Sequence, residues 1–479
     1  MRLFGISFTP RQTWSVVGDV LAASVAIYLA HFFRFGPGNV LVVDPTAIVR
    51  QELPAVLIFL SANLLTLFML DAYSPSIDFR RPVQLGRLWA APFSALIFEI
   101  VVDFFFPSAI WGRGIATLST VTFAALLTLW RFGIARFAPW PTFRRRTLVV
   151  GDGEPERIVW NLIKGNAEYR QMYDLLGVVT FPRFGYRRRE DTPPPPSIPD
   201  DMPVLGAARE LRELVGKHQI ELIIVAVRGT LSSDLARVLL ECKAQGVRVE
   251  EMPTIYKRLT GKVPIFHTSD NWLIFGPVFA STSTANATIF RVADITCALI
   301  GLLLSAIPVA LAAALVKLDS KGPAFYLQER LGYNERPFKI IKLRTMREDA
   351  EAKTGAVWSQ GAADPRITRV GRFLRRTRLD ELPQFWNVLV GDMSIVGPRP
   401  EREVFIRKLK DEIPFYSLRF AVKPGVTGWA QVNFRYGASV DDAAEKLCYE
   451  VFAIQEMTLA LYVVILVKTV QTMLFKPGS

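Results

Sequence analysis

The residue types best suited to chemistry gather in one segment, where two adjacent carboxylates follow a row of arginines. Asp380 and Glu381 come directly after a stretch in which arginines recur at spacings of three and four between apolar residues. Those spacings place the arginines on one face of a helix. Such a face suits contact with solvent or lipid headgroups, or a clamp for diphosphate, because an arginine fork matches two phosphate oxygens. The arginines are Arg366, Arg369, Arg372, Arg375, Arg376 and Arg378.

The two carboxylates lie where a helix is expected to begin. Pro383 is tolerated only in a first turn, and apolar residues recur at helical spacing up to Leu389. Unpaired N–H groups and the helix dipole favour anions at such an end. Capping would explain Asp380 alone, but not the second acid at Glu381, and adjacent carboxylates repel unless they share a cation. With oxygen ligands only, magnesium is the expected ion at Asp380 and Glu381.

More basic residues lie on both sides of this segment. Lys342 and Arg344 belong to a basic, alternating stretch that predicts a strand leading into a turn. Further on, Arg399 stands between two prolines, which hold it in a stiff turn. A rigid turn needs no ligand, but an arginine held in this way is well placed to grip a phosphate.

Composition limits the chemistry to carboxylates and basic residues. The 479 residues include three dispersed cysteines and three histidines, which argues against a disulfide framework and a Cys- or His-based metal site. Hydrophobic residues make up 51% and charged residues 21%. Together with the mean hydropathy of +0.25, this excludes a disordered or fibrous chain and indicates that part of it lies in lipid. The net charge of +13 then favours anionic lipid and phosphorylated substrates over nucleic acid.

Four apolar stretches open the chain and predict a four-helix transmembrane bundle over residues 1–143. Each approaches the ~20 residues that cross a bilayer. Arginines gather in the loops of one side, which predicts that both ends of the bundle face the cytoplasm. Asp19, Glu99 and Asp103 lie in or beside these stretches, and we expect them to face the bundle interior. The stretches are Trp14–Phe33, Leu53–Leu70, Leu85–Phe106 and Ile115–Ile134.

Residues 144–265 alternate short apolar strands with helices, which predicts a Rossmann-like α/β domain. Its first strand runs into Gly151-Asp152-Gly153, which resembles the start of a dinucleotide fingerprint. The third glycine is replaced by Glu156, and the second strand lacks the acid that would bind ribose. A regulatory or oligomerising module is therefore favoured, with bound NAD as an alternative.

A linker is expected at residues 266–288 and a mixed α/β domain at 289–479. This last domain opens with an apolar run at residues 291–317. A full crossing there would place the basic segment outside the cell, where nucleotide-activated substrates are absent. Because proline bends a helix, we expect a re-entrant helix that breaks near Ser305 and Pro308 and returns to the same face. A kinked spanning helix is the alternative.

From about residue 290 to 475 the chain resembles the bacterial sugar transferases that act on polyprenyl phosphate, the monotopic phosphoglycosyl transferases. The resemblance rests on several long motifs in the family's order, among them the run from Leu379 to Pro400 and the stretch 423–433, which contains Gln431. The preceding helices and α/β module resemble the long-form members that start exopolysaccharide, capsule or O-antigen repeats.

This resemblance implies an enzyme of the bacterial inner membrane with cytoplasmic α/β and catalytic domains. The reaction would transfer sugar-1-phosphate from a UDP-sugar to undecaprenyl phosphate and release UMP. Asp380 would be the nucleophile of a phosphosugar-aspartyl intermediate and Glu381 the ligand of Mg²⁺. We also expect a homo-oligomer, most simply a dimer. Phosphate or substrate contacts are expected from Lys342, Arg344, Arg375, Arg399 and Gln431.

The chain departs from the family pattern at three places. Ser305 and Pro308 are separated by two residues, whereas the family often has Ser-Pro. Near the C-terminus the family's Asp-x-Tyr-Tyr pattern is replaced by a segment containing Glu450, and a later aspartate by Tyr462. Glu450 could take over a polar role or that role could be absent. Two other functions stay open: a membrane-bound NAD-dependent sugar-nucleotide oxidoreductase or dehydratase, and a non-catalytic scaffold for polysaccharide assembly.

Overall fold

The chain forms two compact units that divide between Phe143 and Arg144, except that Ile6 near the N-terminus groups with the second unit. Each unit is considered by itself. The computed structural model describes residues 2–3, 6–7, 10–35, 53–70, 72–73, 82–105, 113–137, 144–151, 153–180, 202–227, 231–275, 284–347, 364–434 and 439–475.

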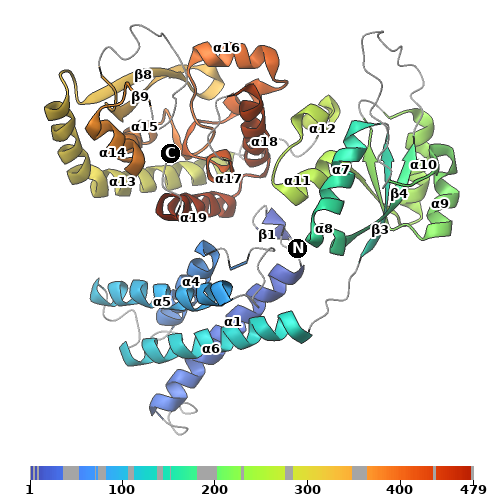
Figure 1. Cartoon of the computed structure of the whole chain (residues 1–479), viewed down its shortest axis with the longest axis horizontal. Helices are drawn as coiled ribbons and strands as arrows, with labels where there is room; N and C mark the ends of the chain where they lie inside the picture. The colour runs from blue at the N-terminus through green and yellow to red at the C-terminus, as the bar shows by residue number, and fades with distance from the viewer. Residues whose placement is uncertain are drawn as a thin grey trace. The chain divides into compact units, whose positions relative to one another are not determined.

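The N-terminal unit contains the four apolar helices expected from the sequence (Figure 1). The acid at Asp19 is fully buried and accepts from Arg131, with 3.1 Å between Nε and Oδ1 and 2.5 Å between Nη2 and Oδ2. Glu99 is also buried, so these two acids face the interior, as expected, whereas Asp103 is only half-buried. Two short strands, β1 (Arg2–Leu3) and β2 (Ile6–Ser7), come first. The helices are α1 (Pro10–Phe35), α4 (Leu53–Met69), α5 (Pro82–Phe105) and α6 (Arg113–Phe137).

Three of the described helices are long and apolar enough to cross a membrane by length and composition. They are the segments Thr13–Arg34 and Gly114–Gly133 of this unit and Ala287–Asp319 of the second unit. Helix α4 is shorter, with 17 residues, and α5 contains Pro92 in addition to Glu99. The protein is therefore a membrane protein, and the four crossings of the first unit stay a prediction.

The second unit begins with a five-stranded parallel sheet flanked by helices (Figure 1). Its strand order, β5-β4-β3-β6-β7, is that of doubly wound sheets. Neighbouring β3 residues point to opposite faces: Leu148 joins the core under α9 and α10, and Val149 the core under α7 and α11. The strands are β3 (Arg145–Gly151), β4 (Tyr173–Thr180), β5 (Val204–Ala207), β6 (Leu222–Ala226) and β7 (Arg248–Glu251). The helices are α7 (Glu154–Gly165), α8 (Ala167–Met172), α9 (Leu211–His218), α10 (Ser233–Ala244) and α11 (Met252–Thr260).

Glu156 fills the turn after β3, where the partial dinucleotide fingerprint lies. The side chain of Glu156 is 3% exposed in the first turn of α7, and a Cβ added at Gly151 would lie 2.0 Å from its Oε2. In doubly wound dinucleotide sites this turn receives the diphosphate. A buried carboxylate in its place disfavours such a ligand by charge and by volume.

The segment after α11 packs into the core of the C-terminal region. Val263 and Ile265 lie in one hydrophobic cluster with Trp272, Leu273 and residues as distant as Ile465. The described part of residues 266–288 therefore includes a helix, and the domain boundaries stay predictions. This segment comprises η3 (Ile265–His267) and α12 (Asp270–Phe275).

The C-terminal region surrounds that core with a hairpin, a small parallel pair of strands and several helices (Figure 1). The strands are β8 (Phe325–Leu331), β9 (Pro337–Leu343), β10 (Ser394–Val396) and β11 (Gly425–Thr427). The longer helices are α13 (Thr284–Asp319), α14 (Arg369–Thr377), α15 (Gln384–Val390), α16 (Glu403–Glu412), α18 (Val440–Glu456) and α19 (Leu459–Phe475). The shorter ones are η5 (Tyr333–Glu335), η7 (Leu379–Glu381), η8 (Tyr416–Ala421) and α17 (Trp429–Asn433).

Helix α13 is continuous through Ser305 and Pro308. Figure 1 shows that α13 changes direction along its length. A proline removes one helical hydrogen bond while the flanking turns persist, so a bend needs no interruption. The Oγ of Ser305 donates to the carbonyl of Leu302 at 3.5 Å.

Candidate active site

The adjacent carboxylates lie on η7, a short turn between α14 and α15. Helix α14 ends at Thr377, and Arg378, which caps it, has a left-handed φ of 58° that redirects the chain. Asp380 and Glu381 follow, and α15 begins three residues after Glu381 with Pro383 as its N-cap. The acids therefore precede a helix N-terminus, as the sequence predicted.

Glu381 joins three separate elements through one carboxylate oxygen. Its Oε1 accepts from Lys342 Nζ of β9 at 3.1 Å and from Arg399 Nη2 at 2.5 Å. Burial alone would raise the pKa of Glu381, but the charges of Arg399 and Lys342 outweigh it and hold that pKa well below its usual range. Glu381 is thus a carboxylate that stays ionised and orients two cations.

Asp380 occupies a different electrostatic environment from its neighbour. The residue is 8% exposed. Burial, with the negative charge of Glu381 adding to it, raises the pKa of Asp380, and the positive charges of Lys342, Arg375 and Arg399 oppose this. Those three basic residues are therefore close enough to influence Asp380 by charge. The two acids therefore differ in environment: Glu381 is paired with two cations, whereas Asp380 has a raised pKa.

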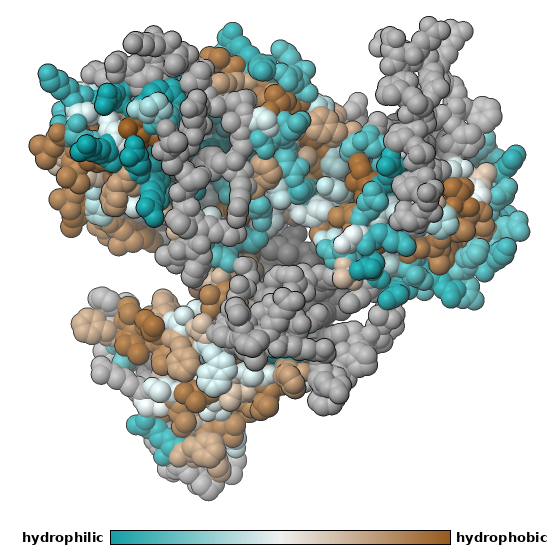
Figure 2. Space-filling view, viewed as in Figure 1, coloured by the Kyte–Doolittle hydropathy of each residue, from teal (hydrophilic) through white to brown (hydrophobic). Residues whose placement is uncertain are grey.

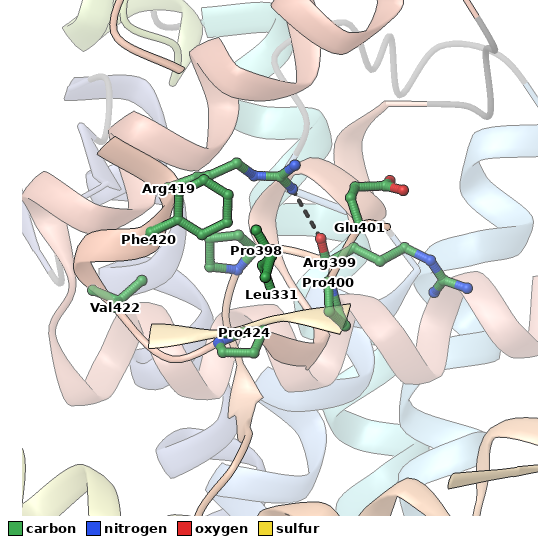
Figure 3. A pocket seen from close by; sticks show the side chains of 10 residues that line it. Leu331, Pro398, Arg399, Pro400, Glu401, Arg419, Phe420, Val422 and Pro424 are labelled. Carbon is green, nitrogen blue, oxygen red and sulfur yellow. Dashed lines mark hydrogen bonds between the residues drawn. The ribbon is translucent and has the colours of Figure 1, made fainter. Parts of the chain in front are cut away.

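The turn that carries Arg399 is held tightly against the strand pair. Gly397 precedes it, and a Cβ there would lie 2.4 Å from the carbonyl oxygen of Lys423, so only glycine fits this approach. The backbone of β10 pairs in parallel with β11. A small pocket lies beside the turn and is lined in part by Pro398, Pro400 and Arg419 (Figure 3).

Comparison with known proteins covers this part of the chain. Residues 285–476 match the family model described as bacterial sugar transferase. A UDP-glucose:undecaprenyl-phosphate glucose-1-phosphate transferase from Caulobacter vibrioides is 41% identical over 192 residues, which are 38% of this chain and 69% of that relative. The chain belongs to the bacterial sugar transferase family.

Two further relatives are similar over different extents. A UDP-N-acetylgalactosamine-undecaprenyl-phosphate N-acetylgalactosaminephosphotransferase from Aeromonas hydrophila is 38% identical over 283 residues, 58% of this chain and 62% of the relative. A UDP-glucose:undecaprenyl-phosphate glucose-1-phosphate transferase from Escherichia coli is 45% identical over 165 residues, 34% of this chain and 35% of the relative. The chain thus spans less than two thirds of the length of both.

Among the residues predicted to bind substrate, the structure brings Lys342, Arg375 and Arg399 close to Asp380 and Glu381. Arg375, on α14, donates from Nε to Thr345 Oγ1 at 2.8 Å, and burial lowers its pKa while the charge of Asp380 opposes that shift. Its place beside the acids agrees with a role in charge neutralisation.

Arg344 and Gln431 form hydrogen bonds away from the two acids. The buried guanidinium of Arg344 donates from Nη2 to the carbonyl of Ser320 at 2.8 Å and from Nη1 to the carbonyl of Lys321. It therefore fixes the chain that leaves α13. Gln431, on α17, donates from Nε2 to the carbonyl of Val426 at 3.1 Å. Contacts of these two residues with substrate stay predictions.

Several residues that position the site were missed from the sequence. Asn387 links α15 to β9: its Oδ1 accepts from the N–H of Ile341 at 3.0 Å, and its Nδ2 donates to the carbonyl of Lys339 at 2.8 Å. These bonds hold the strand of Lys342 against the helix that follows the acids. The available signal was an asparagine within an apolar helical run.

Helix α13 also supports the site through two residues in its first turns. Arg291 donates from Nη1 to the carbonyl of Val388 at 2.7 Å, which anchors the end of α15. Asp294 accepts from the N–H of Ile395 at 2.9 Å and from the hydroxyl of Tyr462 at 2.8 Å. Tyr462, on α19, is thus a hydrogen-bond donor to α13.

The donor set fits magnesium held largely by substrate. Among the residues that the structure describes, no cluster of three or more His, Cys, Asp or Glu side chains could enclose a metal. Mg²⁺ is often bound by one or two carboxylates, with water and phosphate oxygens completing its shell. Asp380 and Glu381 are adjacent carboxylates beside three cations that suit a diphosphate.

Proposed function

We propose that this protein transfers sugar-1-phosphate from a UDP-sugar to undecaprenyl phosphate. The products are undecaprenyl-diphospho-sugar and UMP, and the reaction is the first membrane step of exopolysaccharide, capsule or O-antigen repeat assembly. The proposal rests chiefly on the cluster of Lys342, Glu381 and Arg399 beside Asp380, inside the family-matched region. The relatives named for transfer to undecaprenyl phosphate support it.

In this proposal Asp380 is the nucleophile. One of its carboxylate oxygens forms a bond to the phosphorus that carries the sugar, and the bond from that phosphorus to the bridging oxygen breaks, so UMP leaves. An oxygen of undecaprenyl phosphate then attacks the same phosphorus and displaces Asp380. The raised pKa of Asp380 makes its ionised form a better nucleophile than an ordinary aspartate.

The main barrier is the approach of an anion to an anion, so charge neutralisation matters more than proton transfer. Lys342, Arg375 and Arg399 supply positive charge from three elements, and Glu381 orients two of them. Magnesium held by Asp380 and Glu381 would neutralise further charge on the diphosphate. Because these groups are fixed before substrate arrives, little reorganisation is needed.

We also propose that α13 is re-entrant and that the α/β and catalytic domains lie in the cytoplasm, at the bacterial inner membrane. Both halves of α13 pack on the C-terminal region: Phe290 and Ala293 pack against its main core, and Ala312 and Val316 cluster with Leu343 and Leu374. If α13 crossed the membrane as a straight helix, its C-terminal end would lie on the far side of the membrane from the rest of the C-terminal region. Apolar side chains are exposed along this helix, where Figure 2 shows hydrophobic residues at the edge of the C-terminal region; Leu303, Leu304 and Ile307 are 79%, 73% and 74% exposed.

For the Rossmann-like domain we propose a regulatory or oligomerising role, with a homodimer as the simplest assembly. The buried Glu156 at the nucleotide-binding turn counts against the NAD-dependent alternative. The scaffold alternative makes a different prediction, because it requires no chemistry from Asp380.

The test is UMP release by the purified protein in detergent with undecaprenyl phosphate, magnesium and a panel of UDP-sugars. UDP-N-acetylgalactosamine and UDP-glucose come first, since the relatives are named for them. We expect release with one donor and a loss of at least about 1000-fold in Asp380→Asn. Asp411→Asn, on the exposed side of α16, is the matched control and should keep full activity. Equal release by Asp380→Asn and wild type would contradict the proposal.

A further inference from the structure

The turn that presents Arg399 can be held by its neighbours mainly through carbonyl groups. Pro398 and Pro400 lack N–H groups, so neither can donate a hydrogen bond. The carbonyl of Pro398 accepts from the N–H of Gly425 at 2.8 Å, and that of Pro400 accepts from Arg330 Nη1 at 3.3 Å. The carbonyl of Arg399 lies between them.

Arg419 holds that middle carbonyl. Its Nη2 donates to the backbone oxygen of Arg399 at 2.8 Å and to Glu450 Oε1 at 2.9 Å, and its Nη1 donates to the hydroxyl of Tyr416. The contact to the turn is the dashed line in Figure 3. Only a guanidinium offers several donors in one rigid plane, so lysine could not satisfy these partners together.

The pair of Arg419 and Glu450 is enclosed by protein. The side chains are 7% and 6% exposed, respectively. Burying a guanidinium is costly unless an anion lies beside it, so Glu450 stabilises Arg419 there and fixes where Arg419 directs its remaining donors. Glu450 lies on α18, far along the chain from the acids on η7.

The Arg399 side chain connects this buried pair to the acids. Figure 3 shows it leaving the turn on the side away from Arg419. Its Nη2 then lies 2.5 Å from Glu381 Oε1. A shift of the Arg399 backbone would therefore displace the guanidinium that faces Glu381, and displacements of about 1 Å can reduce rates about 100-fold.

We propose that Glu450 and Arg419 are positioning residues for Arg399. Glu450 fixes Arg419, Arg419 fixes the Arg399 carbonyl, and the turn then places the Arg399 guanidinium on Glu381. Neither residue needs to touch substrate for this role. The expected effect on kcat rests on the proposed function, whereas the expected effect on the position of the turn does not.

The simpler alternative is that the pair only joins η8 to α18. Both ideas predict a less stable protein when Glu450 is changed, so stability does not separate them. A purely structural pair would act independently of the Arg399 side chain. A positioning pair would lose its kinetic effect once that side chain is removed, which a double-mutant cycle can measure.

The experiment measures kcat, KM and Tm for Glu450→Gln, Arg419→Lys, Arg399→Ala and the two combinations with Arg399→Ala. The matched control is Glu456→Gln on the same helix, which breaks the buried pair formed at 2.7 Å between Glu456 Oε1 and Lys257 Nζ. We expect Glu450→Gln and Arg419→Lys to lower kcat between about 10- and 100-fold. When Arg399→Ala is already present, these two substitutions should lower kcat by less than a further 2-fold, because the guanidinium that they would displace is gone. Glu456→Gln should lower Tm but leave kcat unchanged.

The inference would be overturned if the fold reductions in kcat of Glu450→Gln and Arg399→Ala multiplied in full in the double variant. A second readout needs no activity: amide hydrogen exchange of the peptide containing Gly397, Arg399 and Glu401 should become faster in Glu450→Gln and stay unchanged in Glu456→Gln. Unchanged exchange in Glu450→Gln would also overturn it. If the wild-type protein released no UMP with any donor, the proposed function would fail, and the exchange measurement would still decide whether Glu450 positions the turn.

Discussion

The two α/β regions of the second unit each contain a glutamate of low exposure, and the two glutamates lie in opposite electrostatic settings. In the parallel sheet, Glu156 lies against Gly151 in the turn that receives phosphate in related sheets, and its charge opposes an anion. In the C-terminal region, Glu381 lies between Lys342 and Arg399 and holds them for an anion. Among the described residues, the sheet combines a nucleotide-binding topology with a carboxylate at its phosphate turn, whereas the irregular region holds the acids and cations of the proposed site. Function here follows from the arrangement of charges and not from the fold.

The largest expected effect comes from removing the metal. Chelation of divalent ions should reduce UMP release at least about 1000-fold, because a diphosphate would then meet two acids with less positive charge. Added magnesium should restore the rate. The Tm measured in the same samples serves as the control, since the carboxylates already have protein cations beside them. Full turnover in chelator would show that the basic residues alone suffice.

The second largest effect is expected from removing the negative charge of Glu381. We expect Glu381→Gln to lower kcat about 100- to 1000-fold, because Lys342 and Arg399 lose the charge that orients them. Glu403→Gln, whose partner Arg407 lies on the exposed side of α16, is the control and should behave as wild type. A kcat for Glu381→Gln within about 2-fold of wild type would mean that the ion pairs serve only the fold.

A smaller effect is expected from replacing the planar guanidinium of Arg399 with the ammonium group of lysine. Arg399→Lys keeps the positive charge but cannot reach both Glu381 and a phosphate with planar geometry. We expect it to lower kcat/KM about 10-fold, and Arg399→Ala about 100-fold. If lysine were no better than alanine, geometry would matter more than charge at this position.

The smallest effect is expected in the parallel sheet. Glu156→Gln should change UMP release by less than about 2-fold, because it lies in the sheet's turn and not at the acids. Added NAD should not raise the Tm of the wild-type protein, and the absorbance spectrum of the purified protein should show no nicotinamide. A rise in Tm with NAD would show that the parallel sheet binds a nucleotide, and this would contradict the contrast drawn between the sheet and the C-terminal region.

Local sequence patterns predicted much of this protein. The N-terminal apolar helices, the parallel α/β sheet and the family are confirmed, because hydropathy, strand periodicity and motif order are properties of contiguous residues. The positions of Asp380 and Glu381 before a helix were predicted on the same basis. The roles of the site residues stay predictions.

Contacts between distant segments were not predictable in this way. Arg344 belonged to a basic cluster in the sequence, but its partners Ser320 and Lys321 come from the end of α13. Arg419 and Glu450 lie 31 residues apart, and neither pattern nor charge indicates that they meet. Such pairs depend on how helices pack, which local periodicity does not encode.

The most direct test of the central claim is to look for the phosphosugar on Asp380. Wild-type protein would be mixed with its UDP-sugar donor and magnesium without undecaprenyl phosphate, then digested and analysed by mass spectrometry. The account predicts a stoichiometric burst of UMP and a peptide containing Asp380 that gains the mass of the sugar phosphate. The adduct should disappear when undecaprenyl phosphate is added and never form in Asp380→Asn. UMP release that begins only with the lipid acceptor, with no adduct on the enzyme, would contradict it.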